Sequence, residues 1–117
     1  MTNSTVPSHG HTTICAPATP QAAGALAVIR MSGPAALEVA GKVFRSNACP
    51  DLTQSPGYRT WFGTVYKPDG EFLDQVLLSV FRAPHSYTGE DSVEFSCHGS
   101  PYIRETLLRV LVENGAV

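Results

Sequence analysis

The sequence predicts an α+β fold, in which a mixed β-sheet carries two to three packed helices. Strand-like apolar runs outnumber the segments with helical spacing, and both kinds alternate along the chain. The chain has 117 residues, which is the length of one domain with its own core. Charged residues make up 15% and hydrophobic residues 43%, and this combination argues against disorder. So little charge also indicates a surface that a partner or further chain covers.

The first part of the chain predicts two strands followed by a helix. Residues 1–11 are polar and are expected to form a disordered leader. The runs 12–16 and 25–31 are short and apolar or β-branched, with a proline-containing loop between them, so each predicts a strand. The Ser-Gly-Pro sequence at 32–34 then predicts a helix start, with serine as the cap. Helical apolar spacing continues to about Arg45.

The second part predicts a hairpin, a further strand and a closing helix. The β-rich runs 58–66 and 72–82 flank a Pro-Asp-Gly turn and are typical of an antiparallel hairpin. Apolar and polar residues alternate over 93–97, which indicates a strand with one apolar face. Residues 100–115 begin with Ser-Pro, have helical apolar spacing and end at a glycine. They therefore predict a capped helix.

Several chemistries have no motif in this sequence. It has no phosphate-binding loop, no dinucleotide-binding glycine pattern and no CxxC or HExxH zinc motif, so we expect no metal and no catalytic residue in this chain. The net charge of −2 gives no electrostatic basis for binding nucleic acid directly. No apolar run approaches the roughly 18 residues of a membrane span, and no signal peptide is recognisable. Three cysteines without metal spacing fit a reduced, cytoplasmic setting.

Two charged residues interrupt predicted strands. Arg30 lies in phase with apolar neighbours, and a charge there needs a partner or a water-lined pocket. It either reaches past the core edge to a carboxylate or contacts an anionic ligand. Glu94 lies in the middle of its strand, on the side opposite Val93 and Phe95. It is either a solvent-facing residue or a carboxylate beneath a pocket, accepting two adjacent N–H donors of a pterin or guanine edge.

Other features of the sequence leave alternatives open. The polar stretch 86–91 is either a capped turn or part of a site. Cys97 and His98 are neighbours in a strand, so their side chains point to opposite faces and a nucleophilic dyad is disfavoured. Aromatic residues between Tyr58 and Tyr66 fall on both faces of one hairpin strand. One face packs in the core, and the other forms an interface or the wall of a ligand site.

Two strings of residues resemble the N-terminal region of the MnmE/TrmE family of tRNA modification GTPases. The first combines residues 13–16 (TICA) and 18–20 (ATP) with 27–34 (AVIRMSGP), and the second is 83–99 (APHSYTGEDSVEFSCHG). The residues 73–76 (LDQV) and 113–116 (ENGA) also fit. The resemblance covers 12–117, and a chance match to the second string is remote.

This resemblance implies a binding module within a longer enzyme. The family combines an N-terminal folate-binding domain with a helical domain and a GTPase domain; only the first corresponds to this chain, over 12–117. GTP, Mg²⁺ and K⁺ thus belong to the missing GTPase domain. The family's N-terminal domain is similar in fold to the tetrahydrofolate-binding domains of the aminomethyltransferase type, and it forms a constitutive homodimer. The implied ligand is 5-formyltetrahydrofolate or 5,10-methylenetetrahydrofolate. It donates one carbon for modifying carbon 5 of the tRNA wobble uridine, together with the flavoprotein MnmG.

Two folate contacts of the family map onto this sequence, at Arg30 and Glu94. A third family contact, a lysine, lies beyond Val117. The loop at 19–25 departs from the family's Thr-Pro-Pro-Gly-Arg-Gly-Gly, because alanines replace glycines that let a backbone approach a ligand. The alternative is therefore a dimerisation platform with a degraded folate pocket. A stand-alone folate-dependent aminomethyltransferase would need a much longer chain.

Overall fold

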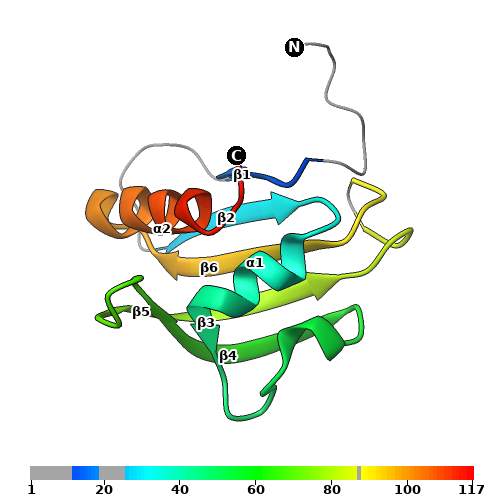
Figure 1. Ribbon diagram of the computed structural model, residues 1–117, viewed down its shortest axis with the longest axis horizontal. Coiled ribbons are helices and arrows are strands. Elements are labelled where there is room, and N and C mark those ends of the chain that lie inside the picture. Colours follow the sequence, from blue (N-terminus) through cyan, green and yellow to red (C-terminus); the bar gives the residue numbers. More distant parts are fainter. Residues whose placement is uncertain (1–11, 19–25, 87) are drawn as a thin grey trace.

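The computed structural model describes residues 12–18, 26–86 and 88–117, and there six strands form one sheet with two helices on one side (Figure 1). The α+β class is confirmed. The predicted leader at 1–11 and the loop at 19–25 lie outside the described residues. The strands are β1 (Ile14–Pro17), β2 (Leu26–Ser32), β3 (Phe44–Arg45), β4 (Arg59–Tyr66), β5 (Phe72–Phe81) and β6 (Ser92–His98). The helices are α1 (Ala36–Val43), the 3-10 turn η1 (Leu52–Gln54) and α2 (Pro101–Glu113).

The strands follow the order β1-β2-β6-β5-β4-β3 across the sheet. The sequence predicts a mixed sheet, but every described strand pair is antiparallel. The reason is that β6 returns between β2 and β5 and runs opposite to both, so no pair needs a parallel crossover. This return places two segments far apart in the sequence, β2 and β6, side by side at the centre of the sheet.

Helix α1 is shorter than the predicted segment, which reaches Arg45. Phe44 has extended backbone angles, is buried and pairs with Val65 of β4, so the chain enters β3 where the helical spacing continues. The ring of Phe44 also occupies the space over Gly63, where a Cβ atom would come within 2.6 Å of it. At the other end, Ser32 stays in β2 and caps nothing. Instead, the hydroxyl of Thr13 accepts a hydrogen bond from the backbone N–H of Ala35, the residue before the helix.

Helix α2 has the caps that the sequence predicts. The Ser100 hydroxyl accepts a hydrogen bond from the backbone N–H of Ile103 at 3.3 Å, and Pro101 occupies the first helical position. The helix ends at Glu113, and Gly115 two residues later has a φ of +123°, a conformation that glycine adopts without strain. These ends fix the length of the helix that covers the central strands.

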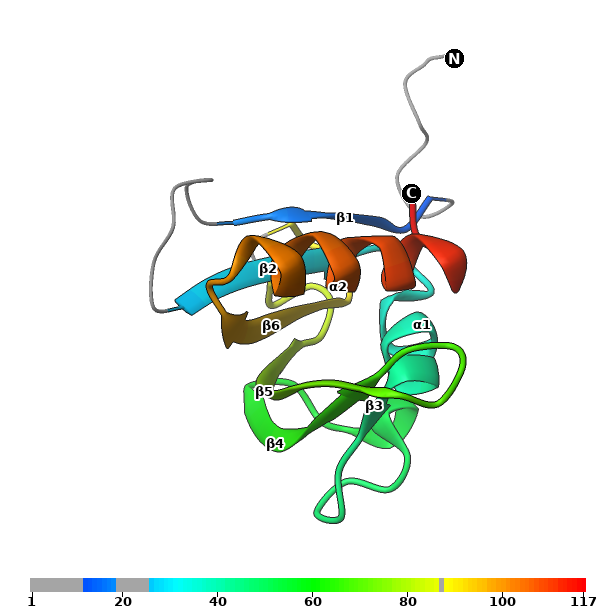
Figure 2. The ribbon, with the colours of Figure 1, turned by 90° about the vertical axis from the view of Figure 1, so that its left-hand side faces the viewer.

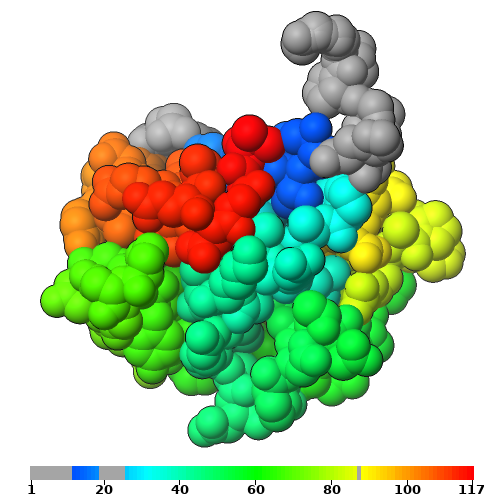
Figure 3. Space-filling view, viewed as in Figure 1, coloured from blue at the N-terminus to red at the C-terminus, as the bar shows by residue number. Residues whose placement is uncertain are grey.

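The core lies between the sheet and the two helices. Alternate residues of the central strands point toward the helices and are fully buried, and Leu78 of β5 and Phe95 of β6 are directly paired there. From the helix side, Leu107 and Leu111 of α2 complete this layer. Side chains of α1 and α2 form a continuous cover over this face in the space-filling view (Figure 3).

The opposite side of the sheet carries neither helix, as Figures 1 and 2 show. We call it the open face. Its members in the four central strands include Val28, Arg30, Glu94, Ser96, Leu77, Ser79, Phe81, Thr60 and Phe62. Large apolar side chains are exposed on it, with Phe62 60% and Leu77 47% accessible. Exposed apolar surface in a cluster is typical of a site that another molecule covers.

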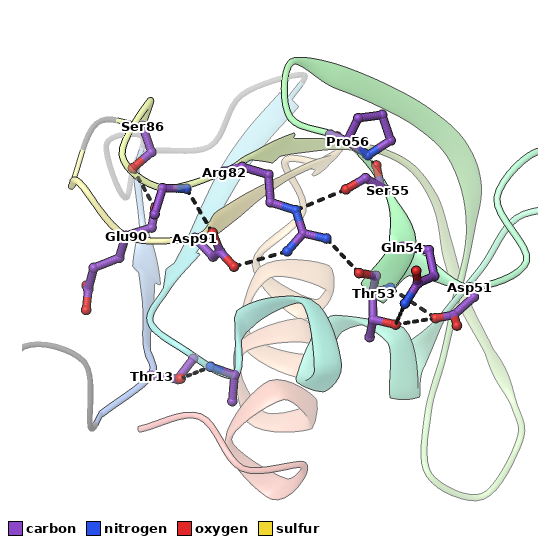
Figure 4. Close-up of polar contacts among 12 residues, drawn as sticks. Thr13, Asp51, Thr53, Gln54, Ser55, Pro56, Arg82, Ser86, Glu90 and Asp91 are labelled. Carbon is purple, nitrogen blue, oxygen red and sulfur yellow. Dashed lines mark hydrogen bonds and ion pairs between the residues drawn. The ribbon is translucent and has the colours of Figure 1, made fainter.

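Arg82, which follows the last residue of β5, makes hydrogen bonds to two loops at this end of the sheet (Figure 4). Arg82 donates hydrogen bonds to the carbonyl oxygens of Ser55 at 3.0 Å and Thr53 at 2.6 Å. Its third contact is an ion pair with Asp91, 3.1 Å between Nη1 and Oδ2. The other carboxylate oxygen of Asp91 accepts from the backbone N–H of Ala83 at 2.8 Å. Both ends of the loop 83–91 are thereby held together.

Replacement of this arginine tests its structural role. Arg82→Met keeps the length of the side chain and removes its hydrogen bonds, so we expect a loss of about 1–3 kcal/mol in the free energy of unfolding. Urea denaturation followed by circular dichroism measures this loss. Arg109→Met, at an exposed position of α2, is the control and should change stability by less than about 0.5 kcal/mol. Equal effects of the two substitutions would contradict the role of Arg82.

Candidate functional site

The two charges that the sequence predicts as site residues form an ion pair on the open face. Arg30 and Glu94 are direct cross-strand partners in β2 and β6. The Nε and Nη2 atoms of Arg30 each lie 2.7 Å from Oε2 of Glu94. The Arg30 side chain is 36% exposed and that of Glu94 is 18% exposed. The structure therefore shows the carboxylate partner of Arg30, while a role of either residue in ligand binding stays a prediction.

The register of the sheet surrounds this pair with small side chains. Ala16 of β1 lies directly beside Arg30, and Ser79 of β5 lies directly beside Glu94. Ser79 in turn shares a 2.9 Å hydrogen bond with Thr60 of β4. None of these three side chains is long enough to cover the charges from the side. Among the described residues, the pair thus lies beside small side chains on both sides.

The carboxylate of Glu94 has unused capacity for hydrogen bonds. Both nitrogens of Arg30 contact Oε2, and within the described part of the chain no group donates to Oε1. A carboxylate offers about four acceptor positions on its two oxygens. Oε1 can therefore accept an N–H donor from a bound molecule while the ion pair stays in place.

Polar residues that precede β6 contact the last residue of β2. The Ser32 hydroxyl lies 2.6 Å from that of Thr88 and donates to the carboxylate of Glu90 at 3.3 Å. The Ser86 hydroxyl donates to the backbone oxygen of Glu90. Ser92, the cross-strand partner of Ser32, is completely buried, and its hydroxyl has no hydrogen-bond partner among the described residues. An orphaned buried hydroxyl is uncommon, and here it lies next to the candidate site.

Cys97 and His98 do not form a nucleophilic dyad. Cys97 faces the helices and is 1% exposed, and its burial raises the pKa of the thiol to about 11. The ring of His98 contacts Asp74 instead, with 2.7 Å between Nδ1 and Oδ1. The backbone N–H of His98 donates to the other oxygen of the same carboxylate at 2.9 Å. The sequence prediction that these neighbours diverge is confirmed.

Sequence reasoning missed Asp74. Its side chain is buried in β5, on the same side of the strand as Val76 and Leu78. A carboxylate in phase with core residues was the available signal, because a buried charge needs hydrogen-bond partners. Asp74 finds them in the turn at His98 that leads into α2, so its position indicates a structural role.

The aromatic residues of β4 and the turn before it divide between the two faces as predicted. Trp61 points toward the helix side and donates from its indole N–H to the Ser55 hydroxyl at 2.8 Å, with the Arg59 guanidinium 4.7 Å from its ring centroid. Phe62 and Tyr58 lie on the other side and are 60% and 72% exposed. The open face therefore has an aromatic border.

The described ranges 12–18, 26–86 and 88–117 contain neither a metal site nor a membrane-spanning helix. No three histidine, cysteine, aspartate or glutamate side chains gather there in a way that would hold a metal ion. No helix in these ranges has the length and apolar character needed to cross a membrane.

The fold and the candidate site define an α+β domain in which one sheet face carries the helices and the other a central Arg–Glu pair. A family model described as "GTP-binding protein TrmE N-terminus" matches residues 13–117. The chain therefore belongs to the TrmE N-terminal family.

Curated relatives support the same assignment. The chain is 52% identical over 101 residues to a protein of Christiangramia forsetii named tRNA modification GTPase MnmE. It is 47% identical over 104 residues to the protein of that name in Bacteroides fragilis, and 48% over 105 residues to that of Chlorobium phaeobacteroides. These matches cover 86–88% of this chain but only 21–22% of the relatives. The chain thus spans about a fifth of their length.

Proposed function

We propose that this domain binds a reduced folate, 5-formyltetrahydrofolate or 5,10-methylenetetrahydrofolate, for a larger tRNA modification GTPase. The observation that supports this most directly is the Arg30–Glu94 pair, because both residues match the family's folate contacts and lie together on the open face. Similarity in fold to tetrahydrofolate-binding domains of the aminomethyltransferase type is part of the same proposal.

Glu94 is the anchor for the pterin in this proposal. Its Oε1 accepts one of the adjacent amino and ring N–H donors of the pterin edge, while Oε2 keeps its contacts with Arg30. Arg30 orients an oxygen of the folate, either on the one-carbon group or on the pterin. The folate, when bound, supplies the one-carbon unit. The residues of this chain bind and position it, and they transfer neither protons nor electrons.

We extend the proposal to the longer protein, since the chain spans about a fifth of the length of its relatives. In it, the GTPase domain binds GTP, Mg²⁺ and K⁺. The complete enzyme acts in the cytoplasm with the flavoprotein MnmG on carbon 5 of the wobble uridine of tRNA. The relatives' shared name, tRNA modification GTPase, supports the reaction class.

A single substitution tests the folate site. Glu94→Gln keeps the size of the side chain but replaces a charged acceptor, so affinity for 5-formyltetrahydrofolate should fall by about 1–3 kcal/mol, or roughly fivefold to 150-fold in Kd. Isothermal titration calorimetry measures this change. Glu105→Gln on the exposed side of α2 is the matched control and should bind like the wild type. Unchanged affinity in Glu94→Gln would remove the anchor role.

The exposed apolar residues favour homodimerisation as a second function of the same face. Phe62 and Leu77 are cross-strand partners and remain 60% and 47% exposed, which is costly for a domain that stays alone in water. A platform that only dimerises, without folate, is the alternative that this observation leaves. This alternative predicts a dimer that does not bind folate, so that Glu94→Gln changes neither folate affinity nor dimerisation.

The dimer can be tested independently of the ligand. The double variant Phe62→Ser, Leu77→Ser should reduce the mass measured by light scattering from that of a dimer to that of a monomer, with an unchanged circular dichroism spectrum. Val112→Ser is the control, because Val112 is also apolar and 49% exposed but lies on α2. A wild-type monomer, or dissociation by Val112→Ser alone, would contradict the use of the open face.

A further inference from the structure

A group of basic side chains lies at the β3 edge of the sheet, at the other end of the strand order from β1. Lys42 comes from the last turn of α1, Arg45 from β3, and Lys67 from the turn after β4. All three line one hollow with a volume of about 530 Å³, together with Tyr66 and Asn114. No carboxylate of the described residues lines it. We call it the basic hollow.

The guanidinium of Arg45 is oriented so that two neighbouring donors stay unused. Its Nη1 atom donates to the backbone oxygens of Gly41 at 2.9 Å and of Phe44 at 3.2 Å, at the carbonyl end of α1. Within the described part of the chain, no group accepts from Nε or Nη2. The Nε–H and one N–H of Nη2 are parallel. This pair is the fork with which arginine binds two oxygens of one phosphate or carboxylate.

Lys42 also has no anionic partner. Its ammonium group lies 3.4 Å from the backbone oxygen of Asn114, and that is a weak contact. Neither Lys42 nor Arg45 forms an ion pair with a carboxylate in the ranges that the structure describes. Lys67 differs from both, since it pairs with Glu71 at 2.9 Å. Two cations of the basic hollow are therefore left to bind an anion from outside the domain.

An exposed aromatic ring borders the same cations. Tyr66 is 37% exposed, and it lines both the basic hollow and a neighbouring hollow of about 430 Å³ that Arg45 also lines. The register of the sheet explains this, because Thr64 is the cross-strand partner of Arg45 and Tyr66 lies two residues further along β4. Such diagonal neighbours have Cα atoms roughly 7–8 Å apart. One molecule can therefore contact the guanidinium and the ring together.

From this donor set we infer that the basic hollow binds a phosphate group of single-stranded RNA, with Arg45 and Lys42 on the phosphate and Tyr66 against a base. Such a contact is separate from the proposed folate site, since the Arg30–Glu94 pair lies in β2 and β6. A forked guanidinium, an ammonium group and an exposed ring are groups with which proteins hold the backbone and the bases of single strands. The matched relatives are named tRNA modification GTPases, and this name favours RNA over a free phosphate as the source of the group.

Charges of both signs surround the basic hollow, so the contact is short-range. Four carboxylates lie on or beside the elements that border it without lining it: Glu38, Asp69, Glu71 and Glu113. They outnumber the three cations, and the net charge of the chain is −2. Attraction over a distance is therefore absent, and the fork, the ammonium group and the ring supply the affinity. We expect weak binding by this chain alone.

The experiment titrates the ¹⁵N-labelled 117-residue chain with a ten-nucleotide oligouridylate at low salt and follows the ¹H–¹⁵N spectrum. Signals of residues 42–47 and 66–70 should shift, with a Kd of roughly 10⁻⁴ M. Lys42→Gln should weaken binding about threefold to tenfold and lower the salt slope by about 0.7, the contribution of one phosphate contact. Arg45→Lys keeps the charge but loses the fork, so it should weaken binding by a similar factor.

Arg109→Gln is the matched control, because it removes one positive charge from an exposed position of α2, away from the basic hollow. It should change the Kd less than twofold. Circular dichroism spectra establish that the variants are folded, and Lys42→Gln removes only a weak contact of the fold.

Four outcomes would overturn the inference, and none of them concerns folate binding. The first is an absence of RNA-induced shifts at 42–47 and 66–70. The second is an equal loss of affinity in Lys42→Gln and Arg109→Gln, which would show that only net charge matters. In the third, inorganic phosphate binds at these residues as tightly as RNA, so the site takes a small anion. In the fourth, a ten-residue glutamate peptide binds more tightly than RNA, which assigns the surface to an acidic protein segment.

Discussion

The two helices of this domain cover only one face of a six-stranded antiparallel sheet. Strand side chains alternate between faces, so half of each central strand enters the core and the other half does not. The core half is apolar apart from the buried carboxylate of Asp74. The other half places a paired arginine and glutamate, small hydroxyl side chains and exposed apolar residues next to one another. Such a mixture suits neither a protein interior nor an ordinary solvated surface, and it is the basis for the ligand and the partner proposed here.

The stability of the fold and the shape of the site are coupled through the end of β5. Arg82 follows this strand directly and joins the loop before β4 to the start of β6 (Figure 4). The same loops supply Tyr58 on one side and the residues from Pro84 to Ser86 on the other. The hydrogen bonds of Arg82 therefore hold both loops at this end of the sheet.

The sequence predicts local features of this fold better than long-range ones. The hairpin, the caps of α2 and the alternation in β6 depend on neighbouring residues and are confirmed. The end of α1 and the strand β3 depend on the fit of Phe44 over Gly63, which no local pattern reveals. Ser32 has the sequence of a helix cap but bonds to Thr88, 56 residues away. The antiparallel arrangement likewise depends on the return of β6 between β2 and β5.

The candidate site shows the same division. Arg30 and Glu94 are recognisable in the sequence because a charge within an apolar strand requires an explanation. Their contact requires the sheet order, and their folate role was taken from the family resemblance. The role of Asp74 is harder to predict from the sequence, since its partners lie at His98, in another strand. The central claim is that the open face binds the ligand. The most direct test records the ¹H–¹⁵N spectrum of the labelled chain during titration with 5-formyltetrahydrofolate. We expect saturable shifts in β2 and β6, with α1 and α2 unaffected. The largest shifts in the helices would contradict it.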